Sequence, residues 1–253
     1  MLNARLIACL DVAGDVVVKG TNFGDLVTLG DPAELAAAYE EQGADEIVLL
    51  DITASVERRT PSFPLIERVA RRLSIPLTIG GGIPDADVLG RVLASGADKA
   101  SVNTPAVMTP SLITEAAARY GSQAVVVAVD VRREDGDWTV WVRGGRERTA
   151  WRMVPWLKRV AELGAGEILL TSIDRDGTGQ GYDVAALRAA SDAVSLPLIA
   201  SGGAARPEQM AEALRLPGVT GALVAGVLHR GETTIARLKA GVAEEGVAVR
   251  VGA

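Results

Sequence analysis

Two aspartates end apolar runs in a sequence that has few other groups able to transfer protons. Asp11 lies in "CLDV" and Asp130 lies in "AVDV". The chain has one cysteine, Cys9, and one histidine, His229, which are too few for a His/Cys zinc site. A Cys–His dyad or a Ser–His–Asp triad would have to use His229, which we expect to be an ordinary residue near a helix start. We therefore predict that Asp11 and Asp130 form an acid and base pair, in environments that keep one protonated and one ionised. A helix cap is the alternative for either aspartate alone.

Two glycine runs, each at the end of an apolar segment, repeat one pattern. "PLTIGGGI" covers residues 76–83 and "PLIASGGA" covers 197–204. Glycines at such a place let backbone N–H groups approach an anion, and the start of a following helix adds a favourable dipole. Tight turns that bind no ligand are the alternative. The pattern predicts two phosphate sites, one made of Gly81, Gly82, Asn103 and Thr104 and the other of Gly202, Gly203, Ala225 and Gly226.

Two opposed phosphate sites predict a long substrate that is phosphorylated at both ends. Further polar residues lie at or just beyond the ends of apolar runs, where they can hold substrate hydroxyls. Lys19, within "DVAGDVVVKGTNFGDL", is expected on a loop that closes over the substrate. The other candidates for substrate contacts are Asp51, Thr171, Asp176 and Ser201.

The elements that must position these residues are short apolar strands that alternate with helical patterns. Each strand is rich in Val, Ile and Leu along its whole length, which indicates burial on both faces. Eight strands alternating with eight helices predict a (β/α)8 TIM barrel in one domain, whose active face lies at the carboxyl ends of the strands. The predicted strands cover residues 5–10, 46–52, 76–80, 99–102, 124–131, 167–173, 197–201 and 221–226.

An internal repeat indicates that the barrel consists of two similar half-barrels. Asp130 follows Asp11 by 119 positions, and the second glycine run follows the first by 121. Equivalent strands of two four-unit halves lie opposite each other in the barrel, which places the two aspartates face to face. We place the halves at about 1–122 and 123–253 within the single domain 1–253. An inserted β-hairpin is expected at about 132–149, where "EDGDW" precedes alternating apolar residues.

Composition excludes several classes of protein. The net charge is −6, and no block of Lys and Arg forms a surface for nucleic acid. No apolar stretch is long enough to cross a membrane, and "MLNARLIACLDV" at the start has neither the apolar core nor the cleavage site of a signal peptide. We therefore expect a cytoplasmic protein that binds neither nucleic acid nor membranes, with Cys9 buried and reduced.

Several motifs together resemble one known family, the cyclase subunit of imidazole glycerol phosphate synthase from histidine biosynthesis. The resemblance spans nearly the whole chain and is most specific in "DITAS" and "DRDGT". The other motifs are "CLDV", "VVKGTNF", "TIGGGI", "GADKASVN", "GYD" and "IASGGA". It implies that Asp11 and Asp130 are the catalytic pair, and that no metal or organic cofactor takes part.

The resemblance also implies a reaction and a partner. Ammonia attacks a doubly phosphorylated ribulosyl aminoimidazole carboxamide intermediate, which is cyclised and cleaved to imidazole glycerol phosphate and aminoimidazole carboxamide ribotide. A glutamine amidotransferase subunit supplies the ammonia from the far face of the barrel, near Asp98. Four charged residues at strand starts match the family's salt-bridge gate for ammonia, namely Arg5, Glu46, Lys99 and Glu167.

The chain departs from the family pattern at a few positions. Proline is common where this chain has Ala8, a Thr-His pair where it has Val142 and Arg143, and serine where it has Gly226. The change at 142 and 143 leaves open which hairpin side chains contact substrate. Gly226 removes one hydroxyl from a phosphate site and leaves its backbone donor.

Two alternative functions share these features. The sister isomerase of the same pathway has the same half-barrel repeat, two comparable aspartates and a related bisphosphate substrate, but needs no ammonia. A non-catalytic barrel that acts as scaffold for an amidotransferase is the other alternative. "VVKGTNF", "DITAS" and "DRDGT" favour the cyclase over the isomerase, and the presence of both aspartates and both glycine runs argues against a scaffold.

Overall fold

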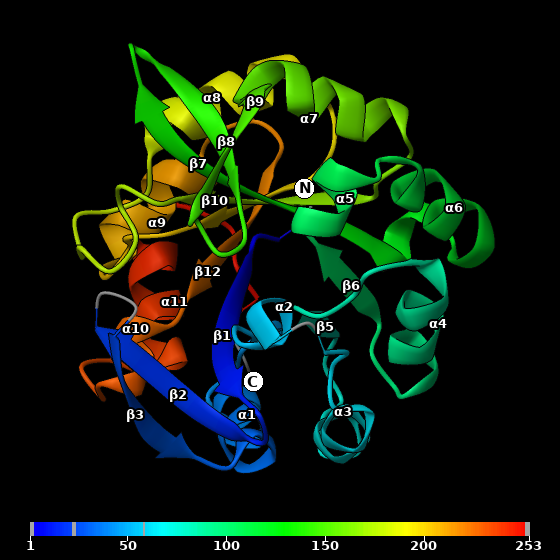
Figure 1. Ribbon diagram of the computed structural model, residues 1–253. Coiled ribbons are helices and arrows are strands. Elements are labelled where there is room, and N and C mark those ends of the chain that lie inside the picture. The colour runs from blue at the N-terminus through cyan, green and yellow to red at the C-terminus, as the bar shows by residue number, and fades with distance from the viewer. Residues whose placement is uncertain (1–2, 22–23, 58, 251–253) are drawn as a thin grey trace.

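A closed barrel of eight parallel strands forms the centre of the computed structural model, which describes residues 3–21, 24–57 and 59–250 (Figure 1). Neighbouring strands pair in chain order, and the pairs between β12 and β1 and between β10 and β7 complete the circle. The (β/α)8 prediction is therefore confirmed. The strands are β1 (Arg5–Ala13), β4 (Glu46–Asp51), β5 (Leu77–Gly80), β6 (Lys99–Val102), β7 (Val125–Glu134), β10 (Glu167–Ser172), β11 (Leu198–Ser201) and β12 (Val219–Val224).

Helices surround the barrel, and local sequence signals explain where they begin. At α1, for example, the Asp31 carboxylate accepts hydrogen bonds from the backbone N–H groups of Ala33 and Glu34, and Pro32 occupies the first turn. The main helices are α1 (Pro32–Glu41), α3 (Phe63–Ala70), α4 (Ala86–Ala94), α6 (Ser111–Tyr120), α7 (Met153–Glu162), α8 (Val184–Ala193), α9 (Pro207–Leu214) and α11 (Ile235–Glu244). Short helices that the sequence patterns did not predict are α2 (Ala54–Glu57), α5 (Thr104–Met108), α10 (Gly226–His229) and the 3-10 turn η1 (Ser122–Ala124).

Alternate residues of each barrel strand face the barrel interior. In β1, Ile7 and Cys9 belong to the small inner core, whereas Leu6 and Leu10 pack outward against the helices. Side chains along a strand alternate between its two faces. Arg5 and Asp11 have the same parity as Ile7 and Cys9, so they face inward at the two ends of the barrel.

Antiparallel hairpins extend both β1 and β7 beyond the barrel. β2 (Val16–Thr21) and β3 (Gly24–Gly30) follow β1, and β8 (Asp137–Val142) and β9 (Glu147–Arg152) follow β7. The prediction of a loop around Lys19 was therefore wrong. Pairing with the end of β1 stabilises this short valine-rich segment as a strand, and the sequence of the segment alone does not show that partner.

The two hairpins have the same register relative to their barrel strands. Ala13 lies opposite Val16 and Glu134 lies opposite Asp137, so the second pair follows the first by 121 positions. This is the spacing of the two glycine runs. The shared register supports our proposal that the chain consists of two similar half-barrels, each of which carries a hairpin after its first strand.

A buried ion pair joins the last helix to the amino end of the barrel. The Lys239 ammonium on α11 lies 2.7 Å from the Asp45 carboxylate and also donates to the carbonyl of Arg250. Both side chains are almost fully buried, and the second carboxylate oxygen of Asp45 accepts from the backbone N–H of Leu6. Removal of one partner would leave an uncompensated buried charge.

We predict that Lys239→Met lowers the free energy of unfolding by about 3–5 kcal/mol, because Asp45 loses its counter-ion in a buried place. Urea denaturation monitored by circular dichroism measures the change. The exposed Lys158→Met is the matched control, and the double variant Lys239→Met/Asp45→Asn should recover part of the loss. A single variant as stable as the control would show that the pair contributes nothing.

Candidate active site

The two predicted catalytic aspartates lie on opposite strands at the carboxyl end of the barrel. Asp11 belongs to β1 and Asp130 to β7, and Thr171 is the register partner of Asp130 on β10. Ser201 follows as the partner of Thr171 on β11. The structure therefore brings three predicted polar residues, Asp130, Thr171 and Ser201, side by side along adjacent strands.

Both aspartates have a higher pKa than an ordinary aspartate, mainly because the protein removes much of their solvation. Burial and then the negative charge of Asp176 raise the pKa of Asp11 to about 6, and a weak hydrogen bond from the Cys9 thiol offsets a part. The same two causes raise the pKa of Asp130 to about 7, against a hydrogen bond of 2.8 Å from the side-chain amide of Asn103. Both carboxyls thus exchange protons near neutral pH.

A cavity of about 320 Å³ opens at this end of the barrel between β4, β5, β6, β7 and β10. It brings together one predicted phosphate site, one of the two predicted catalytic aspartates and two of the predicted substrate contacts. The predicted residues that line it are Asp51, Gly81, Gly82, Asn103, Thr104, Asp130 and Thr171. Asp11, Asp176, Ser201, Gly202, Gly203, Ala225 and Gly226 are not part of its lining.

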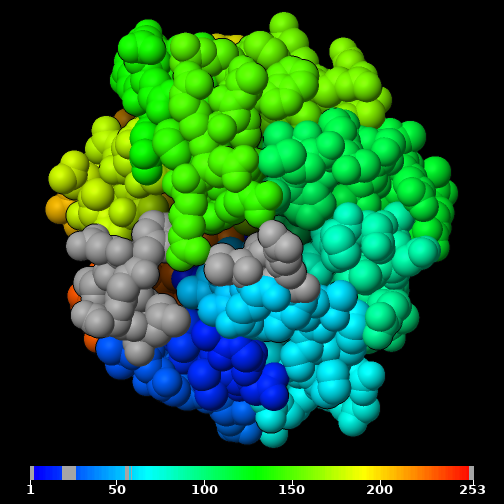
Figure 2. Space-filling view, in the orientation of Figure 1, coloured from blue at the N-terminus to red at the C-terminus, as the bar shows by residue number. Residues whose placement is uncertain are grey.

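The β8–β9 turn forms one wall of this cavity. Figure 2 shows the hairpin, in bright green, reaching to the middle of the active face. Arg143 lines the cavity, and its backbone N–H donates to the Thr104 hydroxyl at 2.9 Å. Val142 is fully buried beside it. Of the two departures from the family pattern in this turn, the arginine is therefore the one that faces the cavity.

Asp51 has several protein partners. Its carboxylate accepts from the backbone of Thr53 and Ala54 at the start of α2, and it forms an ion pair with Arg59. The side chain is buried. Arg59 was missed by the sequence reasoning, because nothing in the residues that follow β4 shows that the chain folds back onto the end of that strand.

Lys19 lies on β2, with its backbone opposite Val27 of β3. Its side chain lies outside the described part of the chain. Its predicted contact with substrate therefore stays a prediction.

Close packing between neighbouring βα turns explains the glycines that follow β5 and β11. A Cβ on Gly81 would lie 2.2 Å from the carbonyl oxygen of Asp51, and one on Gly202 would lie 2.7 Å from the carbonyl oxygen of Ser172. Both glycines also have φ near +90°. The two contacts are equivalent in the two halves, since Ser172 follows Asp51 by the same 121 positions that separate the glycines. The glycines therefore serve tight packing, whether or not an anion approaches them as well.

We predict that Gly81→Ala lowers the free energy of unfolding by about 3 kcal/mol or prevents folding, because the methyl group overlaps a backbone carbonyl and the residue has positive φ. Thermal and urea denaturation measure the loss. Gly14→Ala is the matched control, since Gly14 has φ of +64° but open space around it. Equal losses in the two variants would contradict the packing explanation.

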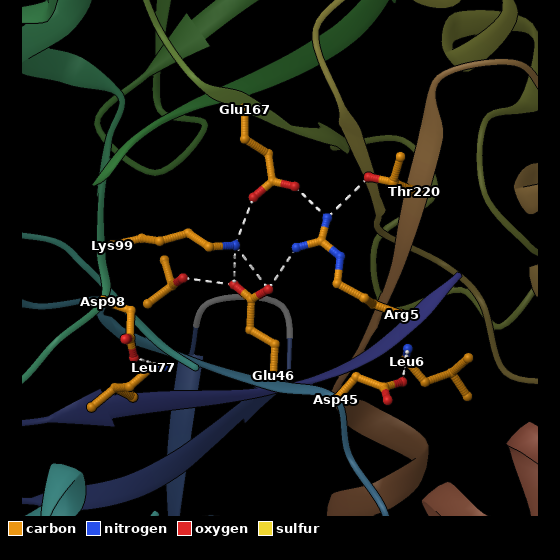
Figure 3. A network of polar contacts seen from close by, with 10 residues as sticks. Arg5, Leu6, Asp45, Glu46, Leu77, Asp98, Lys99, Glu167 and Thr220 are labelled. Carbon is orange, nitrogen blue, oxygen red and sulfur yellow. Dashed lines mark hydrogen bonds and ion pairs between the residues drawn. The ribbon is translucent and has the colours of Figure 1, made fainter. Parts of the chain in front are cut away.

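Four charged residues form a closed ring at the opposite end of the barrel (Figure 3). Arg5 forms ion pairs with both Glu46 and Glu167, and Lys99 forms ion pairs with the same two carboxylates at 2.8–2.9 Å. Each is the first residue of its strand. The structure thus joins the four predicted gate residues in one network, in which each charge has two opposite neighbours.

Two threonines complete this network and were missed by the sequence reasoning. Thr78 donates to Glu46 at 2.7 Å, and Thr220 accepts from Arg5 at 2.9 Å. Nothing in the sequence indicates that an uncharged residue near the start of a strand will hydrogen-bond to an ion-pair network. Asp98, which was expected near a docking surface, accepts from the backbone N–H of Leu77 at the same end of the barrel.

The described part of the chain comprises residues 3–21, 24–57 and 59–250. Within that part of the chain, no helix is long and apolar enough to cross a membrane. Within the same residues, no three His, Cys, Asp or Glu side chains are grouped so that they could hold a metal ion.

Comparison with known proteins identifies the family. The family model described as "Histidine biosynthesis protein" matches residues 5–234. "Imidazole glycerol phosphate synthase subunit HisF" of Geobacillus thermodenitrificans is 50% identical over 252 residues, which cover 99% of this chain and 100% of that protein. The chain belongs to this family. Members from Myxococcus xanthus and Saccharolobus solfataricus bear the same name and are 48% and 49% identical, again over 99% of this chain and 99–100% of each relative.

Membership of this family confirms the resemblance seen in the motifs. The names of the relatives favour the cyclase over the sister isomerase, and the word "subunit" indicates that these relatives act with a partner chain. The roles of individual residues rest on the geometry described above.

Proposed function

We propose that this chain is the cyclase subunit of imidazole glycerol phosphate synthase. It uses ammonia to convert the phosphoribulosyl aminoimidazole carboxamide intermediate to imidazole glycerol phosphate and aminoimidazole carboxamide ribotide in histidine biosynthesis. The observation that carries the proposal is the pair of strand-end carboxyls, Asp11 and Asp130, with pKa values raised to about 6 and about 7. Full-length relatives at about half identity support the choice of reaction. A cytoplasmic location remains part of the proposal.

The raised pKa values of Asp11 and Asp130 suit both carboxyls to proton transfer near neutral pH. We propose that one of them acts as the general acid that protonates the leaving group, and that the other acts as the base that accepts a proton from the attacking nitrogen. Asn103 positions Asp130 through its side-chain amide.

The substrate phosphates are proposed to bind at the two glycine runs. Gly81, Gly82, Asn103 and Thr104 hold one phosphate, and Gly202, Gly203, Ala225 and Gly226 hold the other. Gly82 and Gly203 both have positive φ, so the backbone has a similar conformation in the two turns. This similarity supports equivalent sites in the two halves. Lys19, Asp51, Thr171, Asp176 and Ser201 are proposed to contact the substrate between them. No metal or organic cofactor is proposed.

Turnover of the purified chain with the ribulosyl intermediate and an ammonium salt at alkaline pH tests this function. The proposal predicts imidazole glycerol phosphate without any partner, because free ammonia replaces the glutamine-derived supply. Conversion of the aminoaldose precursor to the aminoketose, with no imidazole product, would show the sister isomerase instead. Binding of both products without any turnover would show a scaffold.

We predict that Asp11→Asn and Asp130→Asn each lower kcat by about 10²–10⁴-fold while KM for the intermediate changes little, since a general acid or base acts on the chemical step. Steady-state kinetics with ammonium salt measures both constants. Asp192→Asn, an exposed aspartate on α8, is the matched control. Loss confined to KM would contradict the proposed roles.

The raised pKa of Asp130 also predicts how stability depends on pH. The folded protein binds this proton up to about pH 7, whereas an unfolded aspartate releases it near pH 4. Stability of the wild type therefore falls as pH rises from about 4 to about 7. Asp130→Asn removes this loss, so the variant should gain about 2–4 kcal/mol relative to the wild type between pH 5 and pH 8. Urea denaturation at several pH values measures it, and a constant difference would contradict the shift.

We further propose that a glutamine amidotransferase subunit docks at the amino end of the barrel and supplies ammonia through the ring of Arg5, Glu46, Lys99 and Glu167. The ring lies at the entrance to the inner core, whose side chains are apolar. Ammonia is small and neutral, so it passes such a core more easily than ammonium does. Asp98 at the same end is proposed to lie near the docking surface. Support comes from the charge pattern and from the word "subunit" in the names of the relatives.

We predict that Arg5→Gln lowers the amount of product formed per glutamine hydrolysed in the complex, because Glu46 and Glu167 lose the cation that they share. Turnover of the chain alone with ammonium salt should stay within about threefold of the wild type, since the reacting centre lies at the other end of the barrel. Paired assays of glutamate and product measure the ratio. An unchanged ratio would contradict the gate.

A further inference from the structure

An arginine side chain folds back over one of the proposed phosphate-binding glycines. Arg230 follows α10, and its Nη1 atom lies 3.1 Å from the place that a Cβ on Gly226 would occupy. The other guanidinium atoms nearest that place, Cζ and Nη2, lie 3.9 and 4.0 Å from it. A side chain at position 226 would therefore displace the guanidinium by some tenths of an ångström or more. Gly226 provides the room for Arg230.

Glu232 fixes the direction of this guanidinium. It accepts from Nε and, at 3.0 Å, from Nη2 of Arg230, which is a bidentate ion pair. Among the described residues, Nη1 donates no hydrogen bond of its own. The nitrogen nearest Gly226 thus retains its donors, and the ion pair holds it there.

We propose that Arg230 is a phosphate ligand of this chain, which supplies a positive charge at the Gly202, Gly203, Ala225 and Gly226 end of the substrate. A phosphate at the backbone N–H of Gly226 would meet the Nη1 donors of Arg230. A guanidinium suits phosphate because it carries a permanent charge and several donors in a fixed plane. The proposal rests on the proposed function, which provides the phosphate ester.

The position of Arg230 gives a physical reason for the departure from the family pattern at position 226. A serine there would offer one neutral hydroxyl to the phosphate. In this chain the glycine removes that hydroxyl and admits a cation, which makes charge-assisted hydrogen bonds that are stronger than neutral ones. Positions 226 and 230 should therefore depend on each other in binding.

The test uses the two reaction products, each of which carries one of the two substrate phosphates. Isothermal titration calorimetry gives Kd for imidazole glycerol phosphate and for aminoimidazole carboxamide ribotide with the full chain. We expect Arg230→Ala to raise Kd about tenfold for one product and less than twofold for the other. Arg215→Ala is the matched control, because Arg215, at the end of α9, is comparably exposed and also forms an ion pair with a glutamate, Glu245. It should change neither constant.

A double-mutant cycle separates a shared site from two independent effects. Gly226→Ser alone should raise the same Kd about threefold, since it pushes the guanidinium away. The double variant Gly226→Ser/Arg230→Ala should bind that product more tightly than Arg230→Ala does, because the serine hydroxyl then occupies the space that the guanidinium has left. Melting temperatures of all variants check that they fold.

Several results would overturn the proposal. One is a Kd for Arg230→Ala that stays within twofold of the wild type for both products, and another is an equal increase in Kd for both products. The third is a double variant whose fold-increase in Kd equals the product of the fold-increases of the two single variants. Failure of the proposed function has a different signature: the wild type would form no imidazole product from the intermediate and an ammonium salt, whether or not it binds the two products.

Discussion

The alternation of side chains along a closed parallel barrel is the constraint on which the structure depends. In β1 it places Arg5, Ile7, Cys9 and Asp11 on the inner face, one above another. The six residue steps from Arg5 to Asp11 span about 20 Å of strand, so these two residues lie at opposite ends of the barrel. One strand therefore contributes a charge to the ring at the amino end, apolar packing to the middle, and a carboxyl to the active face.

The two ends use charge in different ways. At the amino end each charge has opposite neighbours, and the pKa of Glu167 is lowered by Arg5 and Lys99 despite its burial. At the carboxyl end Asp11 and Asp130 are half-buried with no cation beside them among the described residues. The surrounding protein removes much of their solvation and Asp176 adds a further negative charge, so their pKa values rise. The fold thus keeps one end ionised and ion-paired, and leaves the other end able to take up and release protons near neutral pH.

Sequence patterns gave the barrel strands and the main helices, because burial on both faces and helix caps are local signals. They also placed Asp11, Asp130 and the four ring residues at strand ends. They did not give the β2–β3 hairpin, which depends on pairing with β1, nor the contacts of Asp51 with Arg59, of Arg5 with Thr220 and of Gly226 with Arg230. Each of these depends on a fold-back or a register that no local pattern shows. The glycine runs were predicted as anion sites, and the structure adds a packing reason for the same residues.

A crystal structure of the Asp11→Asn variant with the bisphosphorylated intermediate bound tests the central claim most directly. The variant should retain the substrate because its chemical step is slow. We predict one phosphate at Gly81, Gly82 and Thr104, the other at Gly202, Gly203 and Gly226, and the reacting carbon atoms between positions 11 and 130. Both phosphates on one side of the barrel, or a ligand that contacts neither glycine run, would contradict the account.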